Sequence, residues 1–217
     1  MNLWGRNSAH PGWPGSVGPL RVRGGVVRLR PARMRDGSAW SRMRLAEQQN
    51  LEPWEPSAEL NWAERHGFSA WPAMFSGLRG EARRGRMLPY VIELDGRFCG
   101  QLTIGNVTHG ALRSAWIGYW VASEVTGAGV ATGALALGLD HCFGPVGLHR
   151  VEATVRPENA ASRRVLEKAG FREEGLLKRY LNVDGAWRDH YLVAITVEEV
   201  DGSVAAGLVR RGLAHWH

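Results

Sequence analysis

Residues 120–132 read Trp120-Val121-Ala122-Ser123-Glu124-Val125-Thr126-Gly127-Ala128-Gly129-Val130-Ala131-Thr132. This order predicts a strand, a short loop with two glycines and an apolar helix. Gly127 and Gly129 permit a tight turn, and the backbone N–H groups that follow have no partner inside the helix. With the helix dipole, these groups favour an anion such as a pyrophosphate. A glycine turn that simply leads into a core helix is the alternative interpretation.

The segments on either side of this loop predict a mixed α/β fold. Residues 26–31 alternate between apolar and polar side chains, as a half-buried strand does. Asp95-Gly96 and Asp184-Gly185 are hairpin signals between strand-like segments. We therefore expect a central, largely antiparallel sheet of about seven strands, flanked by helices.

Four helical regions are expected around this sheet. Asp36 begins one that runs to about residue 47, and a second region, from about residue 57 to 84, is broken near Gly67 and Pro72. A third starts at Val130 and packs one face on the sheet, with positions 140 and 141 off that face. Asn159 caps the fourth, which ends at Gly170.

Length and composition indicate a single folded domain. The chain has 217 residues, of which 44% are hydrophobic and 22% charged, which is ordinary for a globular protein. Residues 1–25 contain several glycines and prolines with Trp4 and Trp13, and predict a loosely ordered arm or one that docks through its tryptophans. Residues 201–217 form a tail, for which a short helix is one interpretation.

Charge and cysteine usage exclude some classes of protein. The 27 basic residues exceed the 21 acidic ones, for a formal charge of +6, which attracts polyanions and phosphate-rich ligands alike. Since no nucleic-acid-reading motif accompanies the charge, direct nucleic-acid reading is not expected. Cys99 and Cys142 form no CxxC pattern, and His149 and His190 are expected to be hydrogen-bonded structural residues, so no metal site is predicted.

The expected compartment is the cytoplasm. The first residues lack a charged region followed by an apolar one, and no stretch approaches the roughly 20 apolar residues of a membrane span. The two cysteines are then expected to be free buried thiols, although a single disulfide is an alternative.

A second segment points to a known family. Residues 148–162 read Leu148-His149-Arg150-Val151-Glu152-Ala153-Thr154-Val155-Arg156-Pro157-Glu158-Asn159-Ala160-Ala161-Ser162, and Leu166-Glu167-Lys168-Ala169-Gly170-Phe171 follows. With this segment the chain resembles the GNAT superfamily of acetyltransferases over about residues 26–200. The glycine loop resembles the superfamily's pyrophosphate-binding motif. Residues 118–121, 148–153, 158–162, 170–175 and 185–190 resemble its RimJ/RimL-like branch of ribosomal-protein-alanine N-acetyltransferases.

The resemblance implies an N-acetyltransferase domain at residues 26–200, with acetyl-CoA as co-substrate and no metal. It places cofactor contacts at Trp120, Val121, Thr126, Gly127, Ala128, Gly129, Val130, Ala131, Thr132, Asn159 and Ser162. Trp120 as a core residue and Asn159 as a helix cap alone are the competing interpretations. Thr126 and Ala128 stand where the family often has Arg or Gln and a basic residue, so phosphate binding would depend on backbone amides. Leu166 replaces the tyrosine that protonates the thiolate in many members.

The resemblance also implies direct attack of an amine on the thioester. Glu152, on a strand face with Arg150 and Thr154, is the expected general base because a partly desolvated carboxylate binds protons more tightly. A structural salt bridge to Arg150 or Arg188 is the competing interpretation. Ser162 is the candidate that bonds the cofactor sulfur and protonates it. An ordinary serine on the helix surface is the competing interpretation.

Acceptor contacts are expected from the loop at residues 52–56 and from the last strands. Glu52 and Glu55 would face a cationic amino terminus, with Trp54 as an apolar platform, although solvated acids around a rigid turn are the plainer explanation of the loop. Tyr180 is a further substrate-binding candidate. Both Tyr180 and Asp189 are alternative catalytic candidates that also fit a role in shaping the hairpin.

The resemblance predicts acetylation of the α-amine of a protein N-terminus that begins with Ala or Ser, with a ribosomal protein as the first acceptor. A small-molecule amine acetyltransferase and a non-catalytic acyl-CoA-binding module remain alternatives. The sequence leaves open whether the protein is a monomer or a homodimer.

Overall fold

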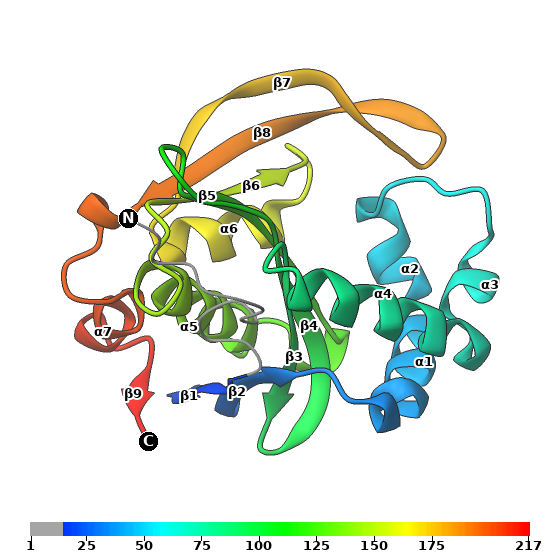
Figure 1. Ribbon diagram of the computed structural model, residues 1–217, viewed down its shortest axis with the longest axis horizontal. Helices are drawn as coiled ribbons and strands as arrows, with labels where there is room; N and C mark the ends of the chain where they lie inside the picture. The colour runs from blue at the N-terminus through cyan, green and yellow to red at the C-terminus, as the bar shows by residue number, and fades with distance from the viewer. Residues whose placement is uncertain (1–14) are drawn as a thin grey trace.

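The computed structural model describes residues 15–217, which form one nine-stranded sheet in the order β7-β8-β6-β5-β4-β3-β2-β1-β9 (Figure 1). All neighbouring strands are antiparallel except β5 and β6, which are parallel. The predicted mixed, largely antiparallel sheet is therefore confirmed. The strands are β1 Val17–Val22, β2 Gly25–Pro31, β3 Leu88–Leu94, β4 Arg97–Thr108, β5 Ser114–Val121, β6 Arg150–Val155, β7 Arg172–Val183, β8 Ala186–Thr196 and β9 His215–Trp216.

The expected number of about seven strands is too low because each end of the chain adds a strand, β1 beside β2 and β9 at the edge of the sheet. β1 lies in the segment assigned to a loosely ordered arm, and β9 lies in the tail. Leu20 and Val22 of β1 are buried and stack against α5, whereas Gly18-Pro19 obscures the alternation in the sequence. Trp4 and Trp13 lie outside the described residues.

Helices cover both faces of the sheet (Figure 1). Helix α5 packs on β1, β2, β4, β5 and β6, and α1 and α4 pack on β4 and β3 from the other side. The α-helices are α1 Gly37–Ala46, α2 Gln48–Leu51, α3 Trp62–His66, α4 Trp71–Arg83, α5 Val130–Phe143, α6 Ala160–Ala169 and α7 Val204–Arg210. Short 3-10 turns are η1 Met34–Asp36, η2 Glu52–Trp54, η3 Phe68–Ala70, η4 Ser123–Val125 and η5 Val197–Glu199.

Helix α5 is buried on nearly every side, which corrects the prediction of a single buried face. His141 is buried, and the carboxylate of Asp140 accepts hydrogen bonds from the backbone N–H groups of Val204 (2.6 Å) and Ala205 (3.1 Å). Asp140 thus caps α7, the short helix in the C-terminal tail. Helix α7 covers the side of α5 that faces away from the sheet, so the residues on that side of α5 are buried as well.

Local signals in the sequence placed most boundaries correctly. Both predicted hairpin turns form, with positive φ at Asp95, Gly96, Asp184 and Gly185. The side chain of Asp36, by contrast, does not cap α1. It forms a buried ion pair with Arg30 (2.7 Å), because a buried guanidinium competes for that carboxylate.

Candidate active site

The parallel strands β5 and β6 separate partway along their length. They are paired from Ser114↔Arg150 to Trp116↔Glu152, and beyond this point β5 pairs with β4 alone. The backbone edge of β5 after Trp116 therefore faces an opening in the sheet. A cavity of about 190 Å³ lies in this opening. We call it the splay cavity; its lining is Trp54, Ile117, Gly118, Tyr119, Ala153, Thr154, Val155, Arg156, Asn159, Ser162, Leu166 and His190.

A second cavity, of about 360 Å³, lies between the end of β5, the glycine loop and α6, and we call it the loop cavity. Trp54, Tyr119, Asn159 and Ser162 line both cavities. The loop cavity brings together ten of the predicted cofactor residues: Trp120, Val121, Thr126, Gly127, Gly129, Val130, Ala131, Thr132, Asn159 and Ser162.

The glycine loop has the geometry that an anion requires. Gly127 (φ 76°) and Gly129 (φ 86°) adopt left-handed conformations that other residues rarely tolerate. Gly129 is the N-cap of α5, and no side chain caps this end. The first N–H groups of α5 are therefore left for a bound anion, with the helix dipole behind them. Arg164 and Lys168 of α6 line the same cavity, so the site fits the diphosphate of CoA.

Ala128 does not line the loop cavity and instead contacts the turn between β1 and β2. Its carbonyl oxygen accepts a hydrogen bond from the Gly24 N–H (2.9 Å). A β-carbon at position 24 would lie 2.8 Å from that of Ala128, so only glycine fits there. Arg23 donates to the carbonyl oxygen of Gly127 (2.6 Å). The segment assigned to a loose arm thus supports the loop and brings a cation to it.

Glu47, at the end of α1, holds the other side of the loop. Its carboxylate accepts hydrogen bonds from the backbone N–H (3.0 Å) and hydroxyl (2.8 Å) of Ser123. Burial opposes ionisation of this group, but the hydrogen bonds from Asn50 and Ser123 outweigh it and hold the pKa of Glu47 below its ordinary value. Sequence reasoning missed Glu47, because 76 residues separate it from Ser123.

Tyr119 and Ser162 form a hydrogen-bonded pair where the two cavities meet. Their hydroxyl oxygens are 3.0 Å apart, and burial raises the pKa of Tyr119 to about 12 despite the bond to Ser162. Asn159 accepts from the Ser162 N–H (3.0 Å), so it caps α6 and lines both cavities. Tyr119 stood inside a motif of the resemblance, yet nothing in the sequence placed it beside Ser162.

Trp120 is half-buried, so it is not a core residue. Its indole N–H donates to Gln101 Oε1 (3.2 Å), and the guanidinium of Arg44 lies 5.0 Å from its ring centre. Trp120 also lines the loop cavity.

Glu152 lies outside both cavities. It shares a face of β6 with Thr154, but it belongs to the part of β6 that is still paired with β5. Its carboxylate accepts a hydrogen bond from Arg150 Nε (2.6 Å). Hydrogen bonds from Arg150 to Glu174 and Glu152 raise the pKa of the guanidinium, although burial opposes this. The structure thus places Glu152 in the ion pair that was the competing interpretation.

The predicted acceptor loop is only partly open. Trp54 lines both cavities, and the guanidinium of Arg156 lies 5.3 Å from its ring centre. Glu55 lines the loop cavity, but its carboxylate is paired with the buried guanidinium of Arg44. Glu52 accepts from Gln48 (2.8 Å) and lines a third cavity, of about 270 Å³, together with Glu55, Glu59 and Asp184.

Burial lowers the pKa of Arg44 even though Glu55 opposes the shift. Arg44 also lies 2.6 Å from His66 Nε2, and burial together with this cation lowers the pKa of His66 to about 4. The cluster is held by Trp62, whose ring centre is 4.7 Å from Arg44. Glu55, which lines the loop cavity, therefore neutralises the buried guanidinium of Arg44.

Tyr180 and Asp189 belong to an irregular part of the β7–β8 hairpin, which arches over the body of the domain (Figure 1). Asp189 accepts from the backbone N–H of Arg179 (2.7 Å) and from Lys178 Nζ (3.0 Å). The ring of Tyr180 lies edge-on to His190, with 5.7 Å between the ring centres. Neither Tyr180 nor Asp189 lines the splay cavity.

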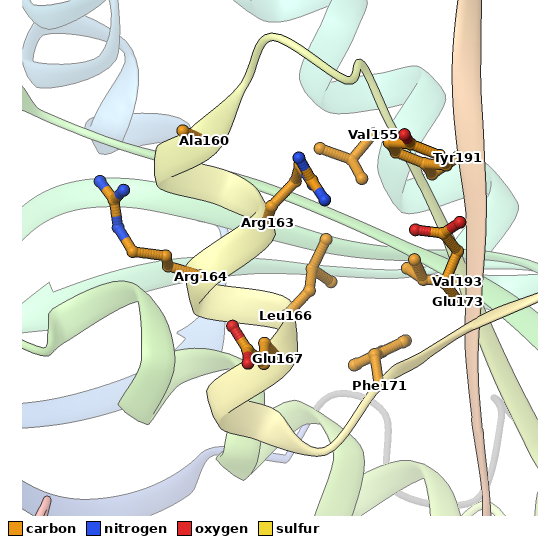
Figure 2. A pocket seen from close by; sticks show the side chains of 10 residues that line it. All are labelled: Val155, Ala160, Arg163, Arg164, Leu166, Glu167, Phe171, Glu173, Tyr191 and Val193. Carbon is orange, nitrogen blue, oxygen red and sulfur yellow. The ribbon is translucent and has the colours of Figure 1, made fainter. Parts of the chain in front are cut away.

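A cavity of about 460 Å³ lies on the far side of α6 (Figure 2). Arg163 points across it toward Tyr191, whereas Arg164 turns to the other side of the helix (Figure 2). It is larger than the loop cavity and the splay cavity, but it lacks a glycine loop and the splayed edge of β5. Its size alone does not make it the site.

Other features of residues 15–217 bear on the earlier expectations. Cys99 and Cys142 are free and buried. Within this range no cluster of three metal-ligating side chains occurs, and none of its helices is both long and apolar enough to cross a bilayer.

Comparison with known proteins identifies the family. Residues 27–172 match the acetyltransferase (GNAT) domain. The alanine N-acetyltransferase of ribosomal protein uS5 from Escherichia coli is 30% identical over 182 residues, which cover 80% of this chain and 88% of that protein. YjcK of Bacillus subtilis, named a probable N-acetyltransferase, is 42% identical over 101 residues, but the chain spans 56% of its length.

Solved structures agree with this result. Mycobacterium smegmatis RimJ in complex with CoA-disulfide is 71% identical, with a TM-score of 0.95 over 96% of this chain and 100% of that one. The splayed strands, the uncapped glycine loop and these matches lead to one conclusion: the chain belongs to the GNAT family of acetyltransferases.

Proposed function

We propose that this enzyme transfers the acetyl group of acetyl-CoA to the α-amine of a protein N-terminus, with a ribosomal protein that begins with Ala or Ser as acceptor. The meeting of the loop cavity and the splay cavity at Tyr119, Asn159 and Ser162 carries this proposal. The loop cavity suits the diphosphate and pantetheine of CoA. The splay cavity then leaves a separate approach for the amine.

The acceptor class is supported by the relatives. The solved structure at 71% identity is named RimJ. The relative at 30% identity is named for acetylating an alanine of ribosomal protein uS5. The acid-lined cavity at Glu52, Glu59 and Asp184 adjoins the loop cavity through Glu55. An acceptor peptide that continues beyond its first residue has room along this surface. Basic side chains in that peptide would complement the negative charge of the cavity. A ribosomal acceptor also implies a cytoplasmic location.

Acetyl-CoA supplies an activated carbonyl, so the protein must orient the amine, accept its proton and stabilise the oxyanion and the thiolate. The unpaired edge of β5 after Trp116 offers backbone N–H groups near the junction of the cavities. The Ser162 hydroxyl lies at that junction and is suited to bond the sulfur.

The test mixes the purified protein with acetyl-CoA and peptides that begin with Ala, Ser, Met or Pro. Free thiol and peptide mass are followed together, and N-terminally blocked copies of each peptide are the matched control. We expect one acetyl group on the α-amine of the Ala or Ser peptides and none on the blocked copies. Thiol release with small amines alone would refute the protein acceptor, and CoA binding without thiol release from any amine would refute catalysis.

A further inference from the structure

His190 is a buried polar residue in the wall of the splay cavity. It lies on β8 and is 3% exposed. Its Nδ1 is 3.1 Å from the carbonyl oxygen of Arg188. Because a carbonyl oxygen can only accept, Nδ1 carries the hydrogen in this bond. The neutral imidazole then has a free lone pair on Nε2.

The Nε2 atom of His190 is not fully enclosed by the protein. The structure gives it no hydrogen bond to any residue between 15 and 217, and it is not one of the fully enclosed unpaired atoms in that range. Since the ring lines the splay cavity, a group that enters this cavity can reach the lone pair.

A bulge in β7 fixes the position of the ring. His190 pairs with Leu177, but two positions earlier on β8 Arg188 pairs with Leu181, so β7 has two extra residues here. Asp189 holds the bulge through the Arg179 N–H, and Arg179 adopts φ 49°. Bulges beside active sites commonly re-aim a side chain. Here the bulge sets Tyr180 edge-on against His190.

Other titratable groups that face His190 are poor proton acceptors. Arg156, after β6, is bonded to Glu158 (3.2 Å) and to the Pro53 carbonyl oxygen (2.9 Å), and arginine keeps its proton. Tyr119, on β5, has a pKa raised to about 12 by burial, so its phenol stays protonated. Tyr180 packs from β7.

The neighbours of His190 on its own strand are also engaged elsewhere. Arg188 Nε is directed at the Val183 carbonyl oxygen, and Asp189 is bonded at the bulge. The lining of the splay cavity contains no carboxylate.

We propose that His190 is the general base for the acceptor amine, an assignment that rests on the proposed acetyl transfer. The amine lone pair forms the C–N bond and the carbonyl becomes a tetrahedral oxyanion. The C–S bond then breaks as the carbonyl re-forms, and its electron pair leaves with the thiolate. The N–H proton of the amine moves to His190 Nε2 and is later released to water. The thiolate takes its proton from water through the Ser162 hydroxyl.

His190→Asn tests this assignment, because the asparagine amide can keep the bond to the Arg188 carbonyl while it removes Nε2. We expect kcat with the Ala-starting peptide to fall about 100-fold or more, with the KM for acetyl-CoA unchanged within about twofold. Because a protonated imidazole cannot accept the proton of the amine, the wild type should lose activity on the acid side of its pH profile, and the variant should lack this dependence. Imidazole added to His190→Ala should restore part of the rate.

Two matched variants separate this role from others. His149→Asn removes an exposed histidine that is paired with Glu198 (3.0 Å) and should leave kcat unchanged. Glu152→Gln removes the base expected from the resemblance and should keep the wild-type pH profile.

The outcomes distinguish the two proposals. A folded His190→Asn with wild-type kcat and pH profile would overturn the base assignment alone, as would loss of the acid-side dependence in Glu152→Gln. If His190→Asn does not fold, failure of imidazole to rescue a folded His190→Ala refutes it. A wild type that acetylates no amine refutes the proposed function and the base together.

Discussion

Tyr119 Oη and Ser162 Oγ lie 3.0 Å apart and join β5 to the first turn of α6 at the junction of the two cavities. Because burial raises the pKa of Tyr119, the phenol remains protonated and can donate to Ser162 Oγ. The Ser162 hydrogen is then free to point toward the sulfur. Leu166, which replaces the family's tyrosine, is buried in the wall of the splay cavity.

Tyr119→Phe should therefore lower kcat without raising the KM for acetyl-CoA. Loss of one hydrogen bond of about 0.5–1.5 kcal/mol corresponds to a roughly two- to tenfold slower rate. If the two hydroxyls act together, the double variant with Ser162→Ala should be little slower than Ser162→Ala alone. Tyr191→Phe, which removes a phenol outside both cavities, is the control. Fully additive effects would show that the two residues act separately.

The contact of Arg23 with the glycine loop predicts weaker cofactor binding in Arg23→Gln. The variant loses the bond to the Gly127 carbonyl oxygen and a positive charge near the phosphates, so the Kd for CoA should rise about three- to tenfold. Arg28→Gln removes an equal charge from the same hairpin without this contact. Calorimetric titration of both variants measures the difference. Equal Kd values would mean that net charge, rather than the contact, matters.

Glu47 should make stability depend on pH. Its folded-state pKa lies below the ordinary value of 4.5, so its stabilisation is present above that value and is lost as pH falls through the folded-state pKa. Glu47→Gln should therefore destabilise the protein by about 1 kcal/mol at pH 7, or roughly 2–4 °C in Tm, and less at pH 3. Glu59→Gln, at an exposed position, is the control. Equal losses at both pH values would contradict this explanation.

Glu55→Gln should reduce stability more than acceptor binding. Arg44 is 4% exposed, and loss of its carboxylate partner should cost about 1–3 kcal/mol. Glu52→Gln changes the neighbouring acid, which has no basic partner among the described residues, and should leave Tm nearly unchanged. Thermal unfolding and the KM for the peptide are measured for both. A higher peptide KM with unchanged Tm in Glu55→Gln would instead support direct contact with the amine.

Signals that act over a few residues were sufficient for much of the fold. Asp95-Gly96 and Asp184-Gly185 specify their turns by backbone conformation, and Asn159 and Gly170 delimit α6 by capping. At the N-terminal end of the domain, local signals were not sufficient to predict the strand. Gly18-Pro19 weakened the strand signal of β1, whereas pairing with β2 and burial of Leu20 under α5 stabilise that strand.

The residues of the site also divide into those that local sequence determines and those that packing brings together. The sequence by itself determined the glycine loop, the helix that begins at Val130 and the capped helix with Ser162, because each depends on local conformation and spacing. Ala128, Glu55 and Glu152 were assigned from position along the chain, and the structure pairs them with Gly24, Arg44 and Arg150. Their roles at the site remain predictions.

The tertiary structure alone decided which distant groups meet at the cavities. Tyr119 and Ser162 are 43 residues apart, Glu47 and Ser123 are 76 apart, and Arg23 and Gly127 are 104 apart. No local pattern encodes such pairs, because each contact depends on how strands and helices pack after they form. The sequence therefore determined the family and the glycine loop, whereas packing of the sheet and its helices decided what surrounds the reacting groups.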